Sequence, residues 1–117
     1  GVLVVTGAGL LSLTGANNDI DASLFTFTGL GSGTYTLTDT ADVDITSGAE
    51  FTITLSTADK AAVNALLDAN GTIASDITTY NLAAAEDWTA GADAAVTVAD
   101  ITGNGITVSN ASVPAIT

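Results

Sequence analysis

Alternation of apolar and polar residues with a period of two is the feature that most limits what this chain can fold into. Residues 50–55 read Glu-Phe-Thr-Ile-Thr-Leu, and residues 24–28 read Leu-Phe-Thr-Phe-Thr. In an extended strand, successive side chains point to opposite faces of the sheet. These segments therefore place their large apolar side chains on one face and Thr on the other. Threonine suits a solvated face because it joins β-branching with a hydroxyl group. Both segments are predicted to be half-buried strands.

Segments of this kind recur along the chain, and turn signals rich in Gly and Asn separate them. Such regular punctuation is typical of an all-β sandwich or barrel. The clearest predicted strands are 2–6, 23–28, 34–38, 50–55, 79–82, 95–98 and 106–109, with shorter candidates at 11–13 and 43–46. The predicted core consists of Phe25, Phe27, Phe51, Ile53, Leu66 and Trp88.

Residues 57–69 interrupt the pattern and predict an α-helix. The preceding string Ser56-Thr57-Ala58-Asp59 begins like a capping box, with Asp in place of the usual Glu at its fourth position. Alanines and leucines follow, and Asn70-Gly71 supplies a left-handed stop. The side chains expected to face the sheet are those of Ala62, Val63, Leu66 and Leu67.

A weak internal repeat suggests an alternative fold, a short β-solenoid of two coils. Tyr35 and Tyr80 lie 45 residues apart (80 − 35), and Phe51 meets Val96 at the same offset. The predicted helix and the first 30 residues have no counterpart in a second copy. The sandwich is therefore the favoured reading.

Charge limits the partners of the chain. Thirteen acidic residues face a single cation, Lys60, and the formal net charge is −12. Nucleic acids and anionic membrane surfaces are polyanions, so neither is an expected partner. No apolar run approaches the roughly 20 residues that span a bilayer, so no membrane insertion is expected.

The chain contains no Cys and no His. It therefore lacks disulfides, thiol chemistry, the usual zinc and haem ligands and the usual general base. No Ser–His or Cys–His nucleophile pair can form, so we predict that the protein is not an enzyme. An Ala- and Thr-rich composition with almost no Lys or Arg is typical of large exported bacterial proteins, which predicts an extracellular or cell-surface location. The chain opens directly on Gly1 and reads as a processed product or as a piece of something longer.

Four strings, taken in this order, carry a resemblance to a known family. They are Gly1-Val2-Leu3-Val4-Val5-Thr6-Gly7, Asp21-Ala22-Ser23-Leu24-Phe25-Thr26-Phe27-Thr28-Gly29, Tyr80-Asn81-Leu82-Ala83-Ala84-Ala85-Glu86-Asp87-Trp88 and Asp100-Ile101-Thr102-Gly103-Asn104-Gly105-Ile106-Thr107-Val108-Ser109. They resemble a tandem module of very long bacterial surface proteins. That module is similar in layout to the bacterial immunoglobulin-like repeats of adhesins and of cyanobacterial swimming-motility surface proteins. The resemblance implies an Ig-like β-sandwich with one inserted helix, used as a repeated spacer, adhesive or lattice unit.

The resemblance also implies a division of the chain, with an Ig-like module over residues 1–111 and a linker or inter-module strand over 112–117. In the modules that it resembles, a segment like Val113-Pro114-Ala115-Ile116-Thr117 opens a repeat and runs into the strand that begins at Gly1. Here that segment follows the module instead. We therefore expect head-to-tail association with copies of the chain or with neighbouring repeats, through residues 112–117.

Two functions follow from these observations. The first is a non-catalytic structural module, a repeat or subunit of an extracellular filament, sheath, stalk or surface layer. The alternative is an adhesin domain that binds a glycan or a host surface, with or without calcium.

Calcium is the one ion that the residue types favour, because it takes six to eight oxygen ligands from Asp, Asn, carbonyl groups and water. No EF-hand loop or toxin-type nonapeptide repeat is present. Asp and Asn are also common turn residues, which is the competing explanation. The candidate ligands are Asp19 and Asp21 beside Asn17 and Asn18, then Asp39, Asp42 and Asp44, and Asp100 with Asn104. Asn70 and Asn110 begin N-glycosylation sequons, which chance also explains in a chain rich in Thr and Asn.

Overall fold

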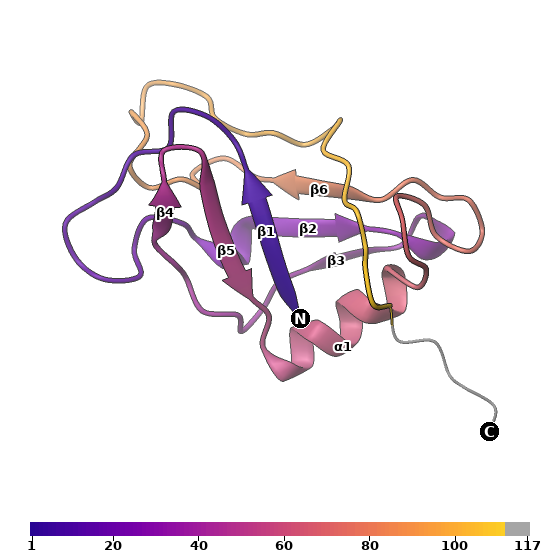
Figure 1. Ribbon diagram of the computed structural model, residues 1–117. Helices are drawn as coiled ribbons and strands as arrows, with labels where there is room; N and C mark the ends of the chain where they lie inside the picture. The colour runs from indigo at the N-terminus through magenta and orange to yellow at the C-terminus, as the bar shows by residue number, and fades with distance from the viewer. Residues whose placement is uncertain (112–117) are drawn as a thin grey trace.

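The computed structural model describes residues 1–111, which form two antiparallel three-stranded sheets and one α-helix (Figure 1). The first sheet has the order β1 (Val2–Thr6), β5 (Glu50–Thr54), β4 (Ile45–Ser47). The second has the order β3 (Thr34–Thr36), β2 (Phe25–Thr28), β6 (Asn81–Ala84). Two short 3-10 helices, η1 (Ala22–Leu24) and η2 (Leu30–Ser32), flank β2. The predicted linker or inter-module strand, 112–117, lies outside the described residues.

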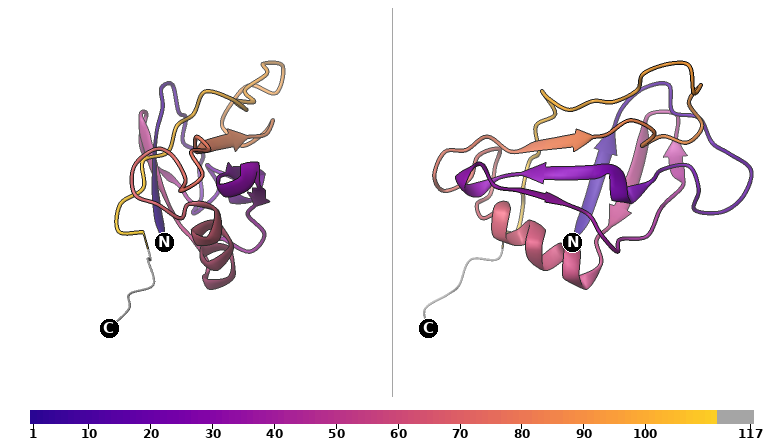
Figure 2. Two further views of the ribbon diagram at one scale, coloured as in Figure 1. Left: turned by 90° about the vertical axis from the view of Figure 1, so that its right-hand side faces the viewer. Right: turned by 180° about the vertical axis from the view of Figure 1, so that it is seen from behind.

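The core lies between the two sheets, which form separate layers in Figure 2. Phe25 and Phe27 of β2 and Phe51 and Ile53 of β5 are buried, as the alternation predicts. The rings of Phe25 and Phe51 lie 5.9 Å apart between centroids and join the layers. Trp88 packs edge-on against Phe25 at 5.8 Å and is only half-buried. Leu66, also predicted for the core, is likewise half-buried against it.

Helix α1 (Thr57–Leu66) lies next to the β2–β3 hairpin and contacts β2, β3 and η2. Ser56 caps it, because its side-chain oxygen accepts a hydrogen bond from the Asp59 N–H at 3.1 Å. Val63 is the helix side chain that is fully buried among the apolar ones. At the far end, Gly29 lies so close to the helix that a Cβ atom there would stand 2.3 Å from the Leu66 carbonyl oxygen.

The helix is shorter than predicted, since it ends at Leu66 and not at residue 69. Side-chain contacts hold the next residues outside the helix. The Asp68 carboxylate accepts hydrogen bonds from the N–H and hydroxyl of Ser75, and the Tyr80 hydroxyl bonds to both the N–H and the C=O of Ala69. The Tyr80 bonds replace the helical ladder at residue 69, and the Asp68 side chain ties the chain after the helix to Ser75.

Two other strand predictions, 95–98 and 11–13, are wrong, and the reason at 95–98 is similar. Residues 95–98 form no strand, because the Glu86 carboxylate accepts from the N–H groups of Val98 and Ala99, and Trp88 donates to the Val98 carbonyl. Side chains thus satisfy the backbone that a ladder would otherwise pair. Residues 11–13 also lack strand structure, and residues 106–109 keep only one bridge, between Val108 and Gly71.

The predicted β-rich class is confirmed at this level of detail. All strand pairings within residues 1–111 are antiparallel, and the sheets stay open, so this part of the chain shows neither a closed barrel nor a solenoid. Within the same residues, no helix is long and apolar enough to cross a membrane.

Candidate functional site

The first sheet ends in an edge strand that has no neighbour on one side. Within the described part of the chain, β1 pairs with β5 only. The Gly1 carbonyl accepts from the Leu55 N–H, and the Gly7 N–H donates to the Ala49 carbonyl. In an antiparallel pair, residues alternate between those bonded to the partner and those whose N–H and C=O point away. The backbone polar groups of Val2, Val4 and Thr6 therefore point to the unpaired edge.

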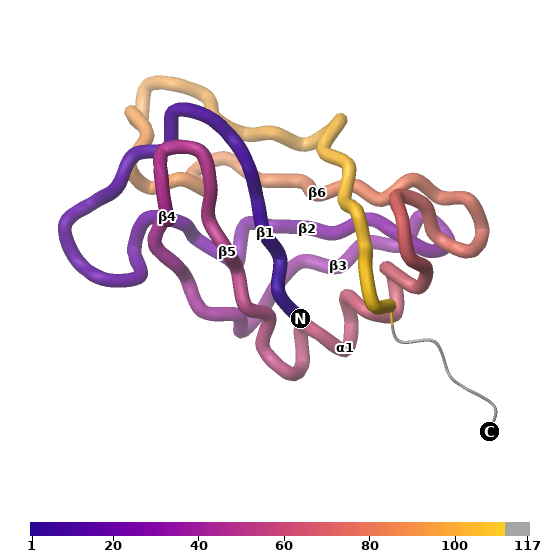
Figure 3. Tube along the Cα trace, viewed as in Figure 1, coloured from indigo at the N-terminus to yellow at the C-terminus, as the bar shows by residue number. Residues whose placement is uncertain are grey.

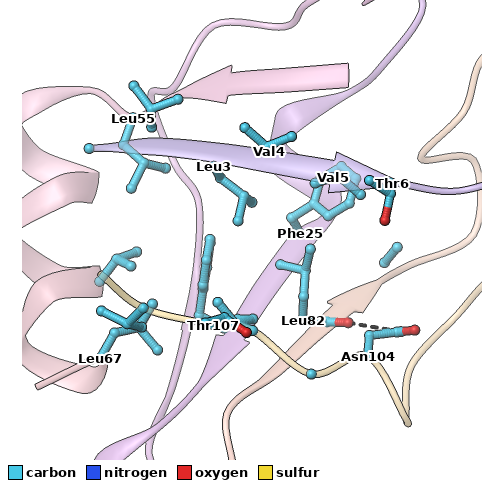
Figure 4. A pocket seen from close by; sticks show the side chains of 18 of the residues that line it. Leu3, Val4, Val5, Thr6, Phe25, Leu55, Leu67, Leu82, Asn104 and Thr107 are labelled. Atoms are coloured by element: carbon cyan, nitrogen blue, oxygen red, sulfur yellow. Dashed lines mark hydrogen bonds between the residues drawn. The ribbon is translucent and has the colours of Figure 1, made fainter. Parts of the chain in front are cut away.

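A groove lies beside this edge, between β1 and the segment 103–111. It has a volume of about 1230 Å³, and its floor includes Phe25, Phe27 and Leu82 from the second sheet. Figure 4 shows Leu3 pointing from β1 into the groove, with Thr107 on the opposite side, while Val4 points away. The two sheets are thus not closed over the core on this side.

Burial along the first sheet shows the same opening. Phe51 and Ile53 of β5 are 0% exposed. Their partners in the register, Val5 and Leu3 of β1, face the same side of the sheet but remain half-exposed. The inner face of β1 is therefore apolar surface that nothing among residues 1–111 fully covers.

The far wall of the groove is held in place by its own hydrogen bonds. The Asn104 side-chain amide donates to the carbonyl of Leu82 at 3.0 Å and to the carboxylate of Asp100 at 2.9 Å. Val108 and Gly71 exchange two backbone hydrogen bonds of 2.8 Å, and the Ala111 N–H donates to the Asn70 side chain. Closing the groove by moving this wall onto β1 would break these bonds.

The groove is nearly free of charged side chains. Of the thirteen acidic residues in the chain, Asp100 alone lines it, and Lys60 is the one basic side chain there. β1 itself carries no charged residue and no proline. Proteins usually protect exposed sheet edges with charges, prolines or bulges. β1 has none of these protections.

The acidic residues predicted as calcium ligands occupy other places. The bridge between Ile20 and Val43 brings Asp19, Asp21, Asp42 and Asp44 into one region. Each carboxylate there accepts hydrogen bonds from backbone N–H groups. The donors are Leu13 and Ile45 for Asp19, Ser23 for Asp21, Ala22 for Asp42 and Asn18 for Asp44.

The remaining candidates are separate from that region. Asp39 accepts from the Ser56 hydroxyl, and Asp100 pairs with Asn104 at the groove wall. Across residues 1–111, no three acidic side chains gather as a group that could hold a metal ion. The carboxylates of Asp19, Asp21, Asp42 and Asp44 instead fix turns through their backbone partners. Backbone N–H groups of Asn17 and Asn18 lower the pKa of Asp44, and the Ser75 hydroxyl and N–H lower that of Asp68. Calcium binding stays a prediction.

The sequence places Asp59 at the start of the helix but does not predict its burial or its hydrogen-bond partners. Its carboxylate is 0% exposed and lies at the start of α1. It accepts from the hydroxyls of Tyr35 and Thr40 at 2.6 Å each, and from the N–H of Thr40 at 3.0 Å. Thr38 and Asp39 add further donors. Burial alone raises the pKa of Asp59, but these hydrogen bonds outweigh it and hold the pKa well below its ordinary value of 3.8.

The Asp59 cluster is an anchor and not a reactive site. Every buried side-chain polar atom among the described residues has a hydrogen-bond partner. The carboxylate therefore ties α1 to the segment that follows β3.

Aromatic side chains do not form an exposed platform. All six lie within residues 1–111, and each is buried or half-buried. The sequon residues Asn70 and Asn110 are exposed.

Comparisons with protein-family models, with curated proteins and with solved structures found no match for this chain. The groove beside β1 is therefore interpreted from its own geometry.

Proposed function

We propose that this chain is a non-catalytic structural module of an extracellular assembly, joined to its neighbours through the open side of its two sheets. The observation that carries the proposal is the groove along the unpaired edge of β1, whose lining has a single acidic and a single basic side chain. An unpaired edge is a template for a strand of another chain, and covering the half-buried side chains of Leu3 and Val5 would add a favourable apolar-area contribution to that pairing.

The proposal takes the two sheets and the inserted helix as an Ig-like β-sandwich with one strand position vacant. Support comes from the packing of the two sheets against each other, in which Phe25 of β2 contacts Phe51 of β5. The composition supports an extracellular or cell-surface location, and the resemblance in the sequence supports a role as a repeat or subunit.

A glycan-binding role has less support. Sugar sites commonly present an aromatic face to the ligand, and no aromatic side chain of this chain is exposed. The adhesin alternative therefore has no observation in its favour within the described residues.

The experiment is a measurement of the mass of the chain in solution over a wide range of protein concentration, by analytical ultracentrifugation. We expect species larger than one copy to form and to increase with concentration. A chain that stays a single copy at every concentration would contradict the proposal.

A further inference from the structure

We infer that the groove beside β1 receives residues 112–117 of a second copy of this module, added as a strand. The inference rests on the proposed function and names the occupant of its open side. An occupant of the groove must match it in shape, charge and length.

The occupant is an extended segment. The backbone N–H and C=O groups of Val2, Val4 and Thr6 form a row along the open edge, and only another strand presents matching groups at the same spacing. Between them, Leu3 and Val5 present apolar side chains to the groove. A strand lying there would direct alternate side chains onto this floor.

The occupant is also uncharged. Each copy carries a net charge of −12, yet one acidic and one basic side chain line the groove. Burying an unpaired charge on this floor would cost far more than strand pairing gains. Residues 112–117, Ser-Val-Pro-Ala-Ile-Thr, contain no charged side chain. Residues 7–18 are uncharged too, but they are held by bonds from Leu10 to Gly48 and from Leu13 to Asp19.

The length of the segment fits the edge. Six extended residues span roughly 20 Å, and the five residues of β1 span about 17 Å. The added strand would itself have a ladder on one side only, which is where a proline such as Pro114 is tolerated.

A second copy satisfies this geometry better than the chain's own tail. In Figure 3, β1 runs away from α1 while residues 105–111 run toward it, and Ala111 is bonded to Asn70 just beyond that helix. The chain's own tail would have to reverse direction at Ala111 to lie along β1. A tight reversal uses at least about two residues, which leaves about four for pairing. The tail of a second copy needs no reversal and can use all six.

Two full-length variants separate the donor from the acceptor. Val4→Pro removes an N–H that points to the open edge, so it blocks the groove while the β1–β5 ladder keeps its bonds. Val4→Thr keeps the N–H and is the matched control. The double variant Val113→Asp/Ile116→Asp puts a carboxylate on both faces of the tail, whichever face meets the groove.

Each of the two blocked variants should associate with itself at least about tenfold more weakly than wild type, and Val4→Thr should behave as wild type. When mixed, the Val4→Pro chain supplies the tail, the double variant supplies the groove, and the pair should form a one-to-one complex. Hydrogen exchange of the isotope-labelled double variant gives a second readout, which holds even if Val4→Pro folds poorly. On adding unlabelled wild-type chain, the amides of Val2, Val4 and Thr6 should become protected, while those of Leu3 and Val5 are already bonded to β5.

The outcomes distinguish this inference from the proposed function. If wild type never associates, both fail. If wild type associates and the tail variant associates equally well, the modules join in another way and this inference alone is wrong. Unchanged exchange at Val2, Val4 and Thr6 in the presence of wild-type chain would overturn it as well.

Discussion

Replacing Asp59 by Ala tests whether a single buried carboxylate holds the helix to the sheets. The substitution removes the acceptor of two donors on the buried Thr40 and of the Tyr35 hydroxyl. A buried donor left without a partner costs about 1–3 kcal/mol, whereas the exposed donors of Thr38 and Asp39 can turn to water. We therefore expect the free energy of unfolding to fall by about 3–5 kcal/mol, out of about 5–15 for a typical domain.

The assay is urea denaturation at pH 7, in which the midpoint should fall while the slope with denaturant stays constant. Asp93→Ala is the matched control, because Asp93 is exposed and its carboxylate accepts from the Ala95 N–H. It should change stability by less than about 0.5 kcal/mol. A loss below about 1 kcal/mol for Asp59→Ala would refute the anchor role.

The stabilising contribution of Asp59 should also depend on pH in a defined direction. The folded-state pKa of Asp59 lies below its ordinary value of 3.8. Its contribution to stability is therefore fully present above the unfolded-state pKa and is lost as the pH falls through the folded-state value. The stability gap between wild type and Asp59→Asn should be constant above about pH 5 and narrow below about pH 4. Acid also reduces charge repulsion in both proteins. This effect cancels when the free energy of unfolding of the variant is subtracted from that of wild type. A gap that widens in acid would contradict the assignment.

Three further predictions follow from the contacts. Gly29→Ala should destabilise by about 1–3 kcal/mol in urea titrations, because a Cβ there would meet the Leu66 carbonyl oxygen, whereas Gly7→Ala, with open space around it, should be nearly neutral. Calcium and magnesium at equal ionic strength should raise the Tm equally, since Asp19, Asp21, Asp42 and Asp44 already accept backbone hydrogen bonds; a Tm gain specific to calcium would instead support the predicted calcium site. Raising NaCl from about 50 mM to about 500 mM should strengthen self-association, because it screens the repulsion between copies of charge −12; weaker association at high salt would contradict an apolar, uncharged joint.

The strands of the core were predictable because side-chain burial decides them locally. Phe51 and Ile53 alternate with Thr, so one face of the segment must be buried whatever it pairs with. Residues 95–98 also alternate, but their backbone is bonded to the Glu86 carboxylate, which precedes them by 12 or 13 positions. A periodic pattern cannot distinguish strand pairing from hydrogen bonding to a side chain, because either one satisfies the backbone N–H groups.

The Asp59 anchor shows a second limit of sequence reasoning. The Ser56 cap was predictable from four consecutive residues. The burial of Asp59 depends on Tyr35, Thr38 and Thr40, which precede it by 24, 21 and 19 positions. One local signal was available: Asp stands where a capping box has Glu, and its shorter side chain is less suited to reach back to the cap. Such an acid needs other donors, and here the turn after β3 supplies them.

The distribution of charge connects the fold to the proposed assembly. Nine of the acidic residues, Asp19, Asp21, Asp42, Asp44, Asp59, Asp68, Asp76, Glu86 and Asp93, accept hydrogen bonds from backbone N–H groups of turns or loops. Acids used in this way stabilise the loops and, together, give each copy a surface that repels other copies. The groove, with Asp100 as its one acid, is a region where this repulsion is weakest and where unpaired backbone and apolar surface coincide. The charge therefore opposes contact least along β1, which is a reason to expect one defined joint and not general aggregation.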